Sequence, residues 1–506
     1  MPIPFLHGTV FITGLVILML EVLGSRVMGP FFGISLYIWA SLISVTLIAL
    51  SLGYWLGGTM ADRKSKPSFL YSIILCSAIA ILLIQFISAP VMEWSYNLLG
   101  IRGGVLLSAL LIFSVPLILL GMASPYVIRL LVKESGSVGR VAGSVFAIST
   151  MGSVIGALLT AFVLIPNLGV NKSFTLGALL LLFLFGVYTI ARKKYYQVLI
   201  TLLIIAISLF LLLFYHRTLA KDDLRQIIYQ TDTLYGQLKV VDILNQDLRA
   251  ALIDGALQSL VHRSASYDAA AMYYVKLIIQ LLPTHQKGGG DALIIGLGAG
   301  EIPRFISKIG YRSDVIDIDP RVEMMAKNYF NFTSEFGRVI IDDGRRYIRS
   351  CTKKYDLIFV DVASGGTQPW YFFTKEAFQE MAKILRPDGI IGINLIGYYQ
   401  GENSKAAQSI NRTLMTAYRY SKIYIPTNPD PSRLINIIFF VSNKPFPENS
   451  EREKILENLN SMTINFNPQD GIILTDNYNP LDLWSIAVSE AFRKAMFGWL
   501  GKKILR

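Results

Sequence analysis

The chain has 506 residues, of which 53% are hydrophobic and 16% charged, and its formal net charge is +12. An ordinary soluble domain is about 25% charged, so much of this chain is expected to lie in lipid. Two cysteines and four histidines exclude a disulfide framework and predict no metal site. The basic residues form no stripe with stacking aromatic side chains, which argues against nucleic-acid binding and favours attraction to the anionic head groups of a lipid bilayer.

The first 215 residues carry most of the apolar excess. A helix needs about 20 apolar residues to cross a bilayer, and seven runs reach that length. They lie near residues 9–29, 36–58, 68–91, 104–124, 142–165, 173–191 and 197–215. We therefore predict an all-α transmembrane bundle over residues 1–215, in a multi-pass protein of the plasma membrane. In the fifth run, Gly143/Ala147 and Gly152/Gly156 predict close helix–helix packing.

Beyond the seventh run the composition becomes that of a globular protein. Residues 216–234 are predicted as a linker. Residues 235–290 are predicted as a small β-hairpin subdomain with a connecting helix, because "GQLKVVDI" and "LRAALIDGALQSLV" alternate like short strands. Residues 291–446 alternate strands with helices, which predicts a Rossmann-like α/β sheet covered on both faces. Residues 447–506 are a C-terminal extension, and its amphipathic helix is expected to lie on a membrane surface.

Glycine and acidic residues follow the predicted strands of the α/β region. "ALIIGLGAGE" at 292–301 is a buried strand with a glycine turn that lets the backbone approach a ligand. Asp317 or Asp319, ending the second strand, is placed to bind a ribose diol. Asp343 is placed to reach an adenine amino group, and Asp361 ends the fourth strand at the same crevice. The predicted nucleoside-binding residues of this region are Gly296, Gly298, Gly300, Glu301, Asp317, Asp319, Asp343 and Gly344.

This ordered series fits an S-adenosylmethionine-type ligand better than NAD, because no redox partner residues accompany it. Its motifs are "IDGALQ" (253–258), "SY" (266–267), "IIGLGAGE" (294–301), "VIDIDP" (315–320), "IIDDGRRYI" (340–348) and "YDLIFVDVASGGTQPWYFFTKEAF" (355–378). Through these motifs, residues 235–395 resemble the spermidine synthase (polyamine aminopropyltransferase) family. Residues 1–215 resemble the membrane domain that is fused to some of its members.

The resemblance implies a reaction and a set of site residues. In the family an amine attacks the carbon next to a sulfonium, methylthioadenosine leaves, and the enzyme positions the partners and takes up a proton. It implies that Gln258 and Asp343 contact the adenosyl group and that Asp317 replaces a ribose-binding glutamate. It also implies that Asp361 is the catalytic aspartate, with Tyr267 beside the reacting amine. The donor would be S-adenosylmethionine or its decarboxylated form, with no metal.

Two positions depart from the family pattern. Ala299 stands where the family has the aspartate that holds the transferred aminopropyl cation, and Ser364 stands where it has a polyamine-binding acid. Each lost carboxylate–ammonium contact costs about 1.5–3 kcal/mol, so ordinary spermidine synthesis is not expected unless Glu301 points inward and compensates. The residues predicted on the substrate side are Ser364, Gln368 and Asp476.

Three functions remain open from the sequence. The first is a membrane-bound aminopropyltransferase-like enzyme, expected to be a homodimer, acting on a small-molecule amine or a lipid. The second is an S-adenosylmethionine-dependent methyltransferase, and the third is a non-catalytic nucleoside-binding transporter or sensor. Two arguments about membrane orientation disagree. The basic loops 61–67, 129–140 and 191–196 predict that the N-terminus lies in the cytoplasm, and seven spans would then place the soluble half outside the cell. Because adenosyl donors are made in the cytosol, we expect the catalytic half there.

Overall fold

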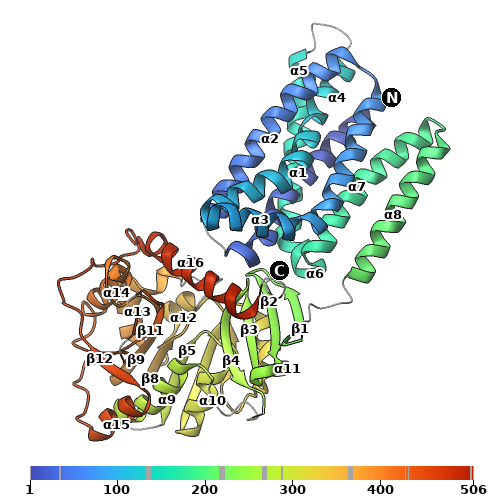
Figure 1. The fold of residues 1–506 in the computed structure, drawn as a ribbon. Helices are drawn as coiled ribbons and strands as arrows, with labels where there is room; N and C mark the ends of the chain where they lie inside the picture. Colours follow the sequence, from blue (N-terminus) through green and yellow to red (C-terminus); the bar gives the residue numbers. More distant parts are fainter. Residues whose placement is uncertain are drawn as a thin grey trace. The chain divides into compact units, whose positions relative to one another are not determined.

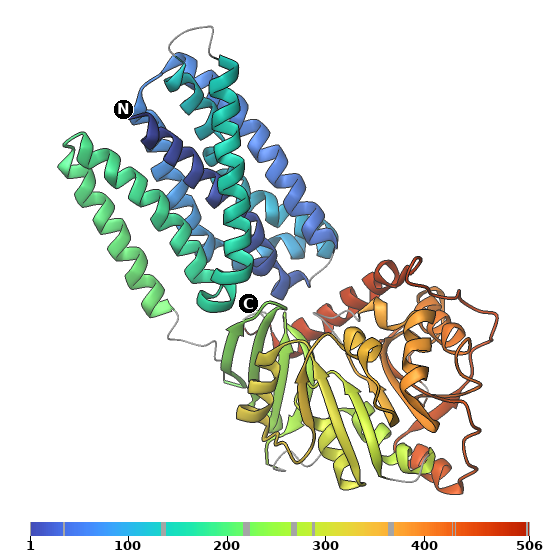
Figure 2. The same ribbon diagram turned by 180° about the vertical axis from the view of Figure 1, so that it is seen from behind.

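The structure is a computed structural model of the whole chain. It describes residues 2–33, 36–132, 138–215, 223–264, 271–285, 289–362, 369–427, 429–430, 432–501 and 504. The chain divides into two compact units. The first consists of Met1–Leu219 with Thr231–Gly236 and Arg506, and the second of Ala220–Gln230 with Gln237–Leu505. Figures 1 and 2 show the two units from opposite sides.

The first unit is all-helical (Figure 1). Its α-helices are α1 (Ile3–Phe32), α2 (Leu36–Arg63), α3 (Pro67–Gly121), α4 (Ala123–Leu131), α5 (Val138–Leu159), α6 (Ile165–Leu168), α7 (Val170–Ala191) and α8 (Tyr195–Tyr215). Within the described residues, five helical stretches are long and apolar enough to cross a membrane. These are Ile3–Phe32, Tyr37–Arg63, Pro67–Leu131, Val138–Leu168 and Val170–Ala191. The predicted count of seven is therefore not confirmed.

The difference in count arises at α3 and at α8. The predicted spans 68–91 and 104–124 both lie on α3, whose helical backbone is interrupted at Gly100 (φ 67°). A Cβ atom on Gly104 would lie 3.1 Å from the carbonyl oxygen of Ser95. Nine residues of straight helix separate their ends by about 13 Å, so the chain folds back at Gly100. At α8, the apolar stretch that the structure describes, Tyr195–Phe210, is shorter than a full span.

Glycines bring α1 and α5 into backbone contact. A Cβ on Gly152 would lie 2.1 Å from the carbonyl oxygen of Phe11, and one on Gly156 would lie 2.2 Å from that of Leu15. The hydroxyl of Ser153 donates to the carbonyl oxygen of Gly14 at 2.9 Å. The prediction of close packing is confirmed for Gly152/Gly156, as expected for small residues at a helix interface.

The second unit begins with a four-stranded antiparallel sheet in the order β1-β2-β3-β4. Its strands are β1 (Arg225–Asp232), β2 (Gln237–Ile243), β3 (Leu248–Ile253) and β4 (Ala256–His262). The predicted hairpin residues form β2, β3 and β4, whereas β1 falls inside the segment predicted as a linker. The large hydrophobic residues of β1, Ile227, Ile228 and Tyr229, are consecutive and do not alternate with polar ones, and most positions of the strand are only half-buried. Helix α9 (Tyr273–His285) follows the sheet.

An eight-stranded sheet forms the centre of the second unit, in the order β12-β10-β11-β9-β8-β5-β6-β7 (Figure 2). Its strands are β5 (Gly290–Ile295), β6 (Tyr311–Asp317), β7 (Arg338–Ile341), β8 (Tyr355–Val360), β9 (Leu385–Gly397), β10 (Tyr420–Pro426), β11 (Ile435–Ser442) and β12 (Ser461–Ile464). Strands β7, β6, β5, β8 and β9 are mutually parallel, and β11 is antiparallel to β9. This confirms the Rossmann-like α/β architecture.

Helices cover both faces of this sheet because alternate strand residues point to opposite sides. Ala292 and Ile294 of β5 pack in a core with α9, α10 (Glu301–Lys308), α11 (Pro320–Phe330) and α15 (Ser450–Asn458). Leu293 and Ile295 pack in the opposite core with α12 (Gly344–Ser350), α13 (Lys375–Ile384) and α14 (Lys405–Leu414). Residues 292–295 of β5 are therefore apolar on both faces, as is typical of a central strand in a buried parallel sheet.

The last helix, α16 (Leu481–Leu500), packs on the second unit itself. Met496 and Leu500 share a core with Ile227 and Val241 of the four-stranded sheet. The buried guanidinium of Arg493 donates to the carbonyl oxygen of Asp254 at 2.7 Å. One apolar face of this helix is thus buried within the fold, and its predicted position on a membrane surface stays a prediction.

Candidate active site

The strand order places the candidate site at the carboxyl ends of β5 and β8. From β5 the chain continues through β6 to β7 on one side, and then crosses to β8 and β9 on the other. Open α/β sheets bind ligands at such a switch point, outside the carboxyl ends of the strands. The glycine turn after β5 and Asp361 after β8 both lie at this point.

The glycine turn is held against both neighbouring segments. Gly296 has a φ of 98°, and a Cβ there would lie 2.2 Å from the carbonyl oxygen of Asp361. A Cβ on Gly298 would lie 2.6 Å from the hydroxyl of Ser259 on β4. That hydroxyl accepts a hydrogen bond from the amide of Ala299 at 2.9 Å. Only glycine fits these two positions, so the turn has its shape before any ligand arrives.

Asp317 connects the end of β6 to the glycine turn. Its carboxylate accepts hydrogen bonds from the amides of Leu297 at 3.0 Å and Asp319 at 2.9 Å. Burial raises the pKa of Asp317 to about 6, although these hydrogen bonds oppose the shift. Asp319 instead caps α11 by accepting from the amide of Arg321 at 2.9 Å. Of the two predicted ribose ligands, Asp317 is thus the one that lies at the turn.

Asp343 and Gly344 lie at the end of β7. The side chain of Asp343 caps α12 by accepting from the amide of Arg346 at 2.8 Å. A Cβ on Gly344 would lie 2.7 Å from the Ile295 side chain, so this position requires a small residue. One carboxylate oxygen of Asp343 is thus engaged in the cap, and its contact with an adenine ring stays a prediction.

Asp361 is partly buried and is held by two side chains that sequence reasoning missed. Its Oδ2 accepts from the hydroxyl of Tyr274 on α9, and its Oδ1 accepts from the amide of Asn394 on β9, each at 2.9 Å. Asn394 is in turn oriented by Asn436 on β11, whose amide donates to it at 2.9 Å. Burial raises the pKa of Asp361, and the two hydrogen bonds lower it. Strand and helix patterns did not reveal Tyr274 and Asn394, because sheet register brings Asn394 to this carboxylate and the packing of α9 brings Tyr274 there.

Glu301 is the first residue of α10, and its side chain points into the fold. The residue is only 5% exposed. Burial, assisted by the charge of Asp361, raises the pKa of Glu301 to about 8, whereas Arg304 and the backbone amide of Leu260 act in the opposite direction. Its Oε1 has no hydrogen-bond partner among the described residues. The negative charge of Asp361 therefore acts on the carboxyl group of Glu301 within the candidate site.

Asp476 lies in an ion-pair network. Its carboxylate accepts two hydrogen bonds from the guanidinium of Arg345, at 2.8 and 2.9 Å, and one from Thr374 at 2.7 Å. Arg345 also pairs with Glu380 at 2.7 Å. These contacts tie the segment before α16 to α12 and α13, which accounts for its position without a ligand. The predicted role of Asp476 in substrate binding stays a prediction.

Three other predicted site residues, Tyr267, Ser364 and Gln368, lie outside the described residues. Gln258 is described on β4, where its side-chain amide donates to the carbonyl oxygen of Ala256 at 3.2 Å. In the part of the chain that the structure describes, no three His, Cys, Asp or Glu side chains gather as a metal site would require.

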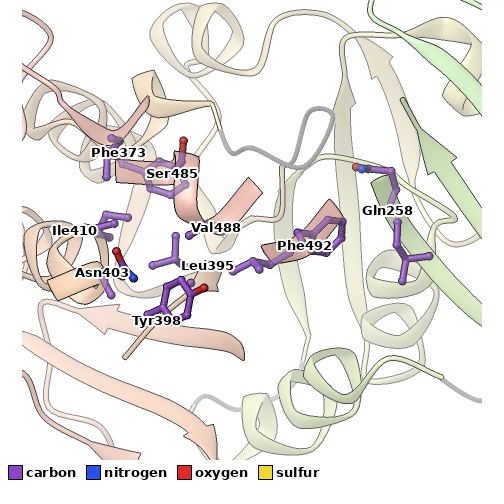
Figure 3. Close-up of a pocket in the computed structure, with 15 residues that line it drawn as sticks. Gln258, Phe373, Leu395, Tyr398, Asn403, Ile410, Ser485, Val488 and Phe492 are labelled. Atoms are coloured by element: carbon purple, nitrogen blue, oxygen red, sulfur yellow. The ribbon is translucent and has the colours of Figure 1, made fainter. Parts of the chain in front are cut away.

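A groove lies at the carboxyl end of β9, where Leu395 is the first residue of that strand to line it. Including the space open to solvent, it encloses about 700 Å³. Its described walls contain no charged side chain. They are Leu257 and Gln258 of β4, Phe373, residues 395–398, Asn403, Ala406, Ala407 and Ile410 around α14, and Leu481, Ser485, Val488 and Phe492 of α16. Figure 3 shows most of these side chains gathered around α16, with Gln258 across the groove.

Residues 272–452 match the family described as the spermine/spermidine synthase domain. A polyamine aminopropyltransferase of Vibrio vulnificus is 35% identical over 178 residues, covering 33% of this chain and 58% of that protein. One from Thermoplasma volcanium is 30% identical over 167 residues, covering 31% and 61%. An N-terminal histidine N-methyltransferase of Emericella nidulans is 28% identical over 195 residues, covering 35% of each chain. The chain thus spans between about a third and two thirds of the length of these curated relatives.

Among solved structures, a probable spermidine synthase from Corynebacterium glutamicum aligns with a TM-score of 0.40 at 19% identity, covering 52% of this chain and 94% of that one. A spermidine synthase in complex with the transition-state analogue AdoDATO aligns with a TM-score of 0.36 at 18% identity, covering 43% and 74%.

The strand order and the helices on both faces of the sheet define a Rossmann-like α/β domain. More narrowly, the C-terminal part of the chain carries a spermine/spermidine synthase domain, which confirms the resemblance found from its motifs.

Proposed function

We propose that the second unit is an aminopropyltransferase-like enzyme that binds an S-adenosyl donor at the glycine turn and transfers its alkyl chain to a nucleophile. The observation that carries this proposal is Asp361, a partly buried carboxylate at the switch point of the sheet that is oriented by Tyr274 and Asn394. A carboxylate held in this way is suited to receive a proton from a reacting amine.

The donor side is formed by the ends of β5, β6 and β7. Gly296 and Gly298 let the backbone approach the adenosyl group, and Asp317 is placed to accept hydrogen bonds from the ribose. Asp343 and Gln258 are assigned to the base and the adenosyl group through the resemblance. The glycine turn already has its shape without a ligand, so binding an adenosyl group would not require the turn to rearrange.

The reaction step conserves atoms and electrons as follows. The lone pair of the acceptor nitrogen forms a bond with the carbon next to the sulfonium, and the carbon–sulfur bond breaks with its electron pair passing to sulfur. The products are an N-alkylated amine and methylthioadenosine. Asp361 takes up the proton that the nitrogen loses, and Tyr274 and Asn394 hold its two oxygens in position. Most of the rate enhancement would come from this positioning.

The acceptor is proposed to carry an apolar portion. The groove lies at the carboxyl end of β9, on the opposite side of β8 from β5–β7, and its described walls carry no charge. A polyamine bound along it would leave an ammonium group desolvated and unpaired, which is costly. An amine with one reactive nitrogen and an aliphatic chain fits these walls better, whether it is a soluble amine or a lipid.

The apolar helices of the first unit support attachment to a membrane. We propose that the protein is a multi-pass protein of the plasma membrane, that its catalytic unit lies in the cytoplasm where adenosyl donors are made, and that it forms homodimers.

A second candidate is methyl transfer from S-adenosylmethionine. The similarity to a histidine N-methyltransferase favours it, as does Ala299 in the glycine turn. The two reactions leave different nucleoside products, methylthioadenosine and S-adenosylhomocysteine.

Product analysis by mass spectrometry tests these proposals. Purified protein in lipid would be incubated with S-adenosylmethionine or its decarboxylated form, together with putrescine, spermidine, a long-chain primary amine or a lipid extract. Methylthioadenosine with an alkylated amine supports the proposal, and S-adenosylhomocysteine supports methyl transfer. If both donors bind and neither is consumed, the protein is not a transferase under these conditions and a sensor or transporter function gains support.

A further inference from the structure

The side chain of Glu301 has an unusual position for a glutamate. Buried acceptor oxygens in folded proteins almost always have a hydrogen-bond donor, and a buried acceptor without one is destabilising, most of all when it carries a charge. Yet Glu301 is only 5% exposed, and its Oε1 has no such donor among the described residues. Nothing in the fold of α10 requires a carboxyl group there. An orphaned acceptor beside a candidate active site therefore calls for a ligand that supplies the missing donor.

The groups around Glu301 come from four elements. The backbone amide of Leu260 on β4 donates to its carboxyl group, and Arg304 lies one turn further along α10. The charge of Asp361 after β8 acts on Glu301, and both acids act on the hydroxyl of Tyr274 on α9. Arg304 donates to the carbonyl oxygen of Phe330 and lies over the Phe336 ring at 5.1 Å. The two carboxyl groups therefore bound the space after the glycine turn.

We infer that Glu301 receives the ammonium group of the donor's transferable chain and replaces an acid missing at Ala299. This inference rests on the proposed function, since it needs the adenosyl group to lie at the glycine turn. Glu301 directly follows that turn, so its carboxyl group lies where a chain leaving the sulfur would pass between Glu301 and Asp361. Of the two cationic groups on such a donor, only the ammonium has N–H groups. A sulfonium carries charge but donates no hydrogen bond, and it would leave Oε1 without a donor.

Glu301 would be protonated in the free protein at pH 7, because burial and Asp361 raise its pKa to about 8. An ammonium group beside it favours the carboxylate, so binding below pH 8 should release up to one proton. Above pH 8 the carboxylate is already present and the release should disappear. A glutamate with a purely structural role would show no proton release on ligand binding.

Isothermal titration calorimetry with three adenosine ligands separates the contribution of the ammonium group to binding from that of the sulfonium and the adenosine. Methylthioadenosine has neither cation, 5′-deoxy-5′-(dimethylsulfonio)adenosine has the sulfonium alone, and decarboxylated S-adenosylmethionine has both. We expect Glu301→Gln to weaken binding of the third ligand about 10- to 150-fold, the range for a charged hydrogen bond. It should change binding of the other two less than twofold. Glu335→Gln, an exposed glutamate in the turn before β7, is the matched control.

The same titrations at pH 7, in two buffers of different ionisation enthalpy, measure the protons released. Release with decarboxylated S-adenosylmethionine that is absent in Glu301→Gln supports the inference. Equal loss of affinity for all three ligands, or no proton release by the native protein, overturns it while leaving the adenosyl site intact. If methylthioadenosine does not bind the native protein at all, the proposed function itself fails. Thermal unfolding of Glu301→Gln with Glu301→Asp as a second variant shows whether each protein is folded.

Discussion

The two sides of Asp361 are built on different physical principles. On the β5–β7 side, backbone amides and carboxylates are already paired: Asp317 accepts from Leu297, and Ser259 accepts from Ala299. On the β9–α16 side, the described walls of the groove are uncharged and mainly apolar, with a few polar side chains such as those of Asn403 and Ser485. A polar, prepaired surface selects one ligand by directional hydrogen bonds, whereas an apolar surface discriminates weakly between ligands of similar size. Under the proposed function, this comparison predicts strict selection of the donor and weaker selection among acceptors of similar size.

The largest expected effect lies at the boundary between the two sides. Asp361→Asn keeps the shape but removes the proton acceptor, so turnover should fall about 10²- to 10⁴-fold. Methylthioadenosine should still bind within a few-fold. Initial rates and calorimetry measure the two quantities, with the exposed Asp388→Asn as control. Full activity in Asp361→Asn would show that the site lies elsewhere.

A smaller effect is expected on the donor side alone. Asp317→Asn cannot accept from both amides and lacks the charge, so donor affinity should fall about 10- to 150-fold with the acceptor KM unchanged. Because the pKa of Asp317 is about 6, native donor affinity should also fall as the pH drops below 6 and should level off above it. This pH dependence should be absent in Asp317→Asn. Donor titrations between pH 5 and 8 measure it, and an identical slope in the variant would contradict the assignment.

The groove can be tested by adding a charge. Val488→Asp introduces a carboxylate into its wall, which should weaken a long-chain amine about 5- to 30-fold, corresponding to about 1–2 kcal/mol. Diamines should bind better, because the new acid can pair with their second ammonium. Leu483→Asp lies on the same helix but is exposed and outside the groove, and it should have no effect. Equal acceptor KM values in both variants would remove the groove from the acceptor site.

The smallest effect is expected at Asp476. Asp476→Asn should lower the free energy of unfolding by about 0.5–1.5 kcal/mol, because it loses the pair with Arg345. The pKa of Asp476 is lowered by Arg345, so this stability is present above about pH 4 and is lost on acidification. Chemical denaturation at pH 7 and pH 3.5 measures the difference. A loss of turnover without a loss of stability would instead favour the predicted role at the crevice.

The donor side was predictable because its residues follow the strands in chain order. The carboxyl ends of parallel strands meet at one edge, so Gly296, Asp317, Asp343 and Asp361 had to converge once the strands were recognised. The acceptor side was not predictable in this way. Its walls come from β4, β9, α14 and α16, which share no motif, and the partners of Asp361 depend on sheet register.

In the first unit, too, the sequence pattern was not sufficient to predict how the segments fold. Hydropathy located the apolar segments, but whether 68–91 and 104–124 are separate helices depends on the single residue Gly100, whose φ of 67° allows the chain to fold back. At Gly152 and Gly156, by contrast, the small-residue spacing was sufficient, because close backbone contact admits few other side chains.

The place of α16 in the chain has a consequence for biosynthesis. Every strand of the donor edge has left the ribosome well before Leu481 is made, whereas one wall of the groove consists of that last helix. During translation the nucleoside half can therefore assemble first, and a chain that terminates before α16 would hold a donor beside an open, solvent-filled acceptor side. Under the proposed function, the acceptor site is therefore complete only when the polypeptide is complete. Chains truncated before α16 are expected to bind the nucleoside without consuming it.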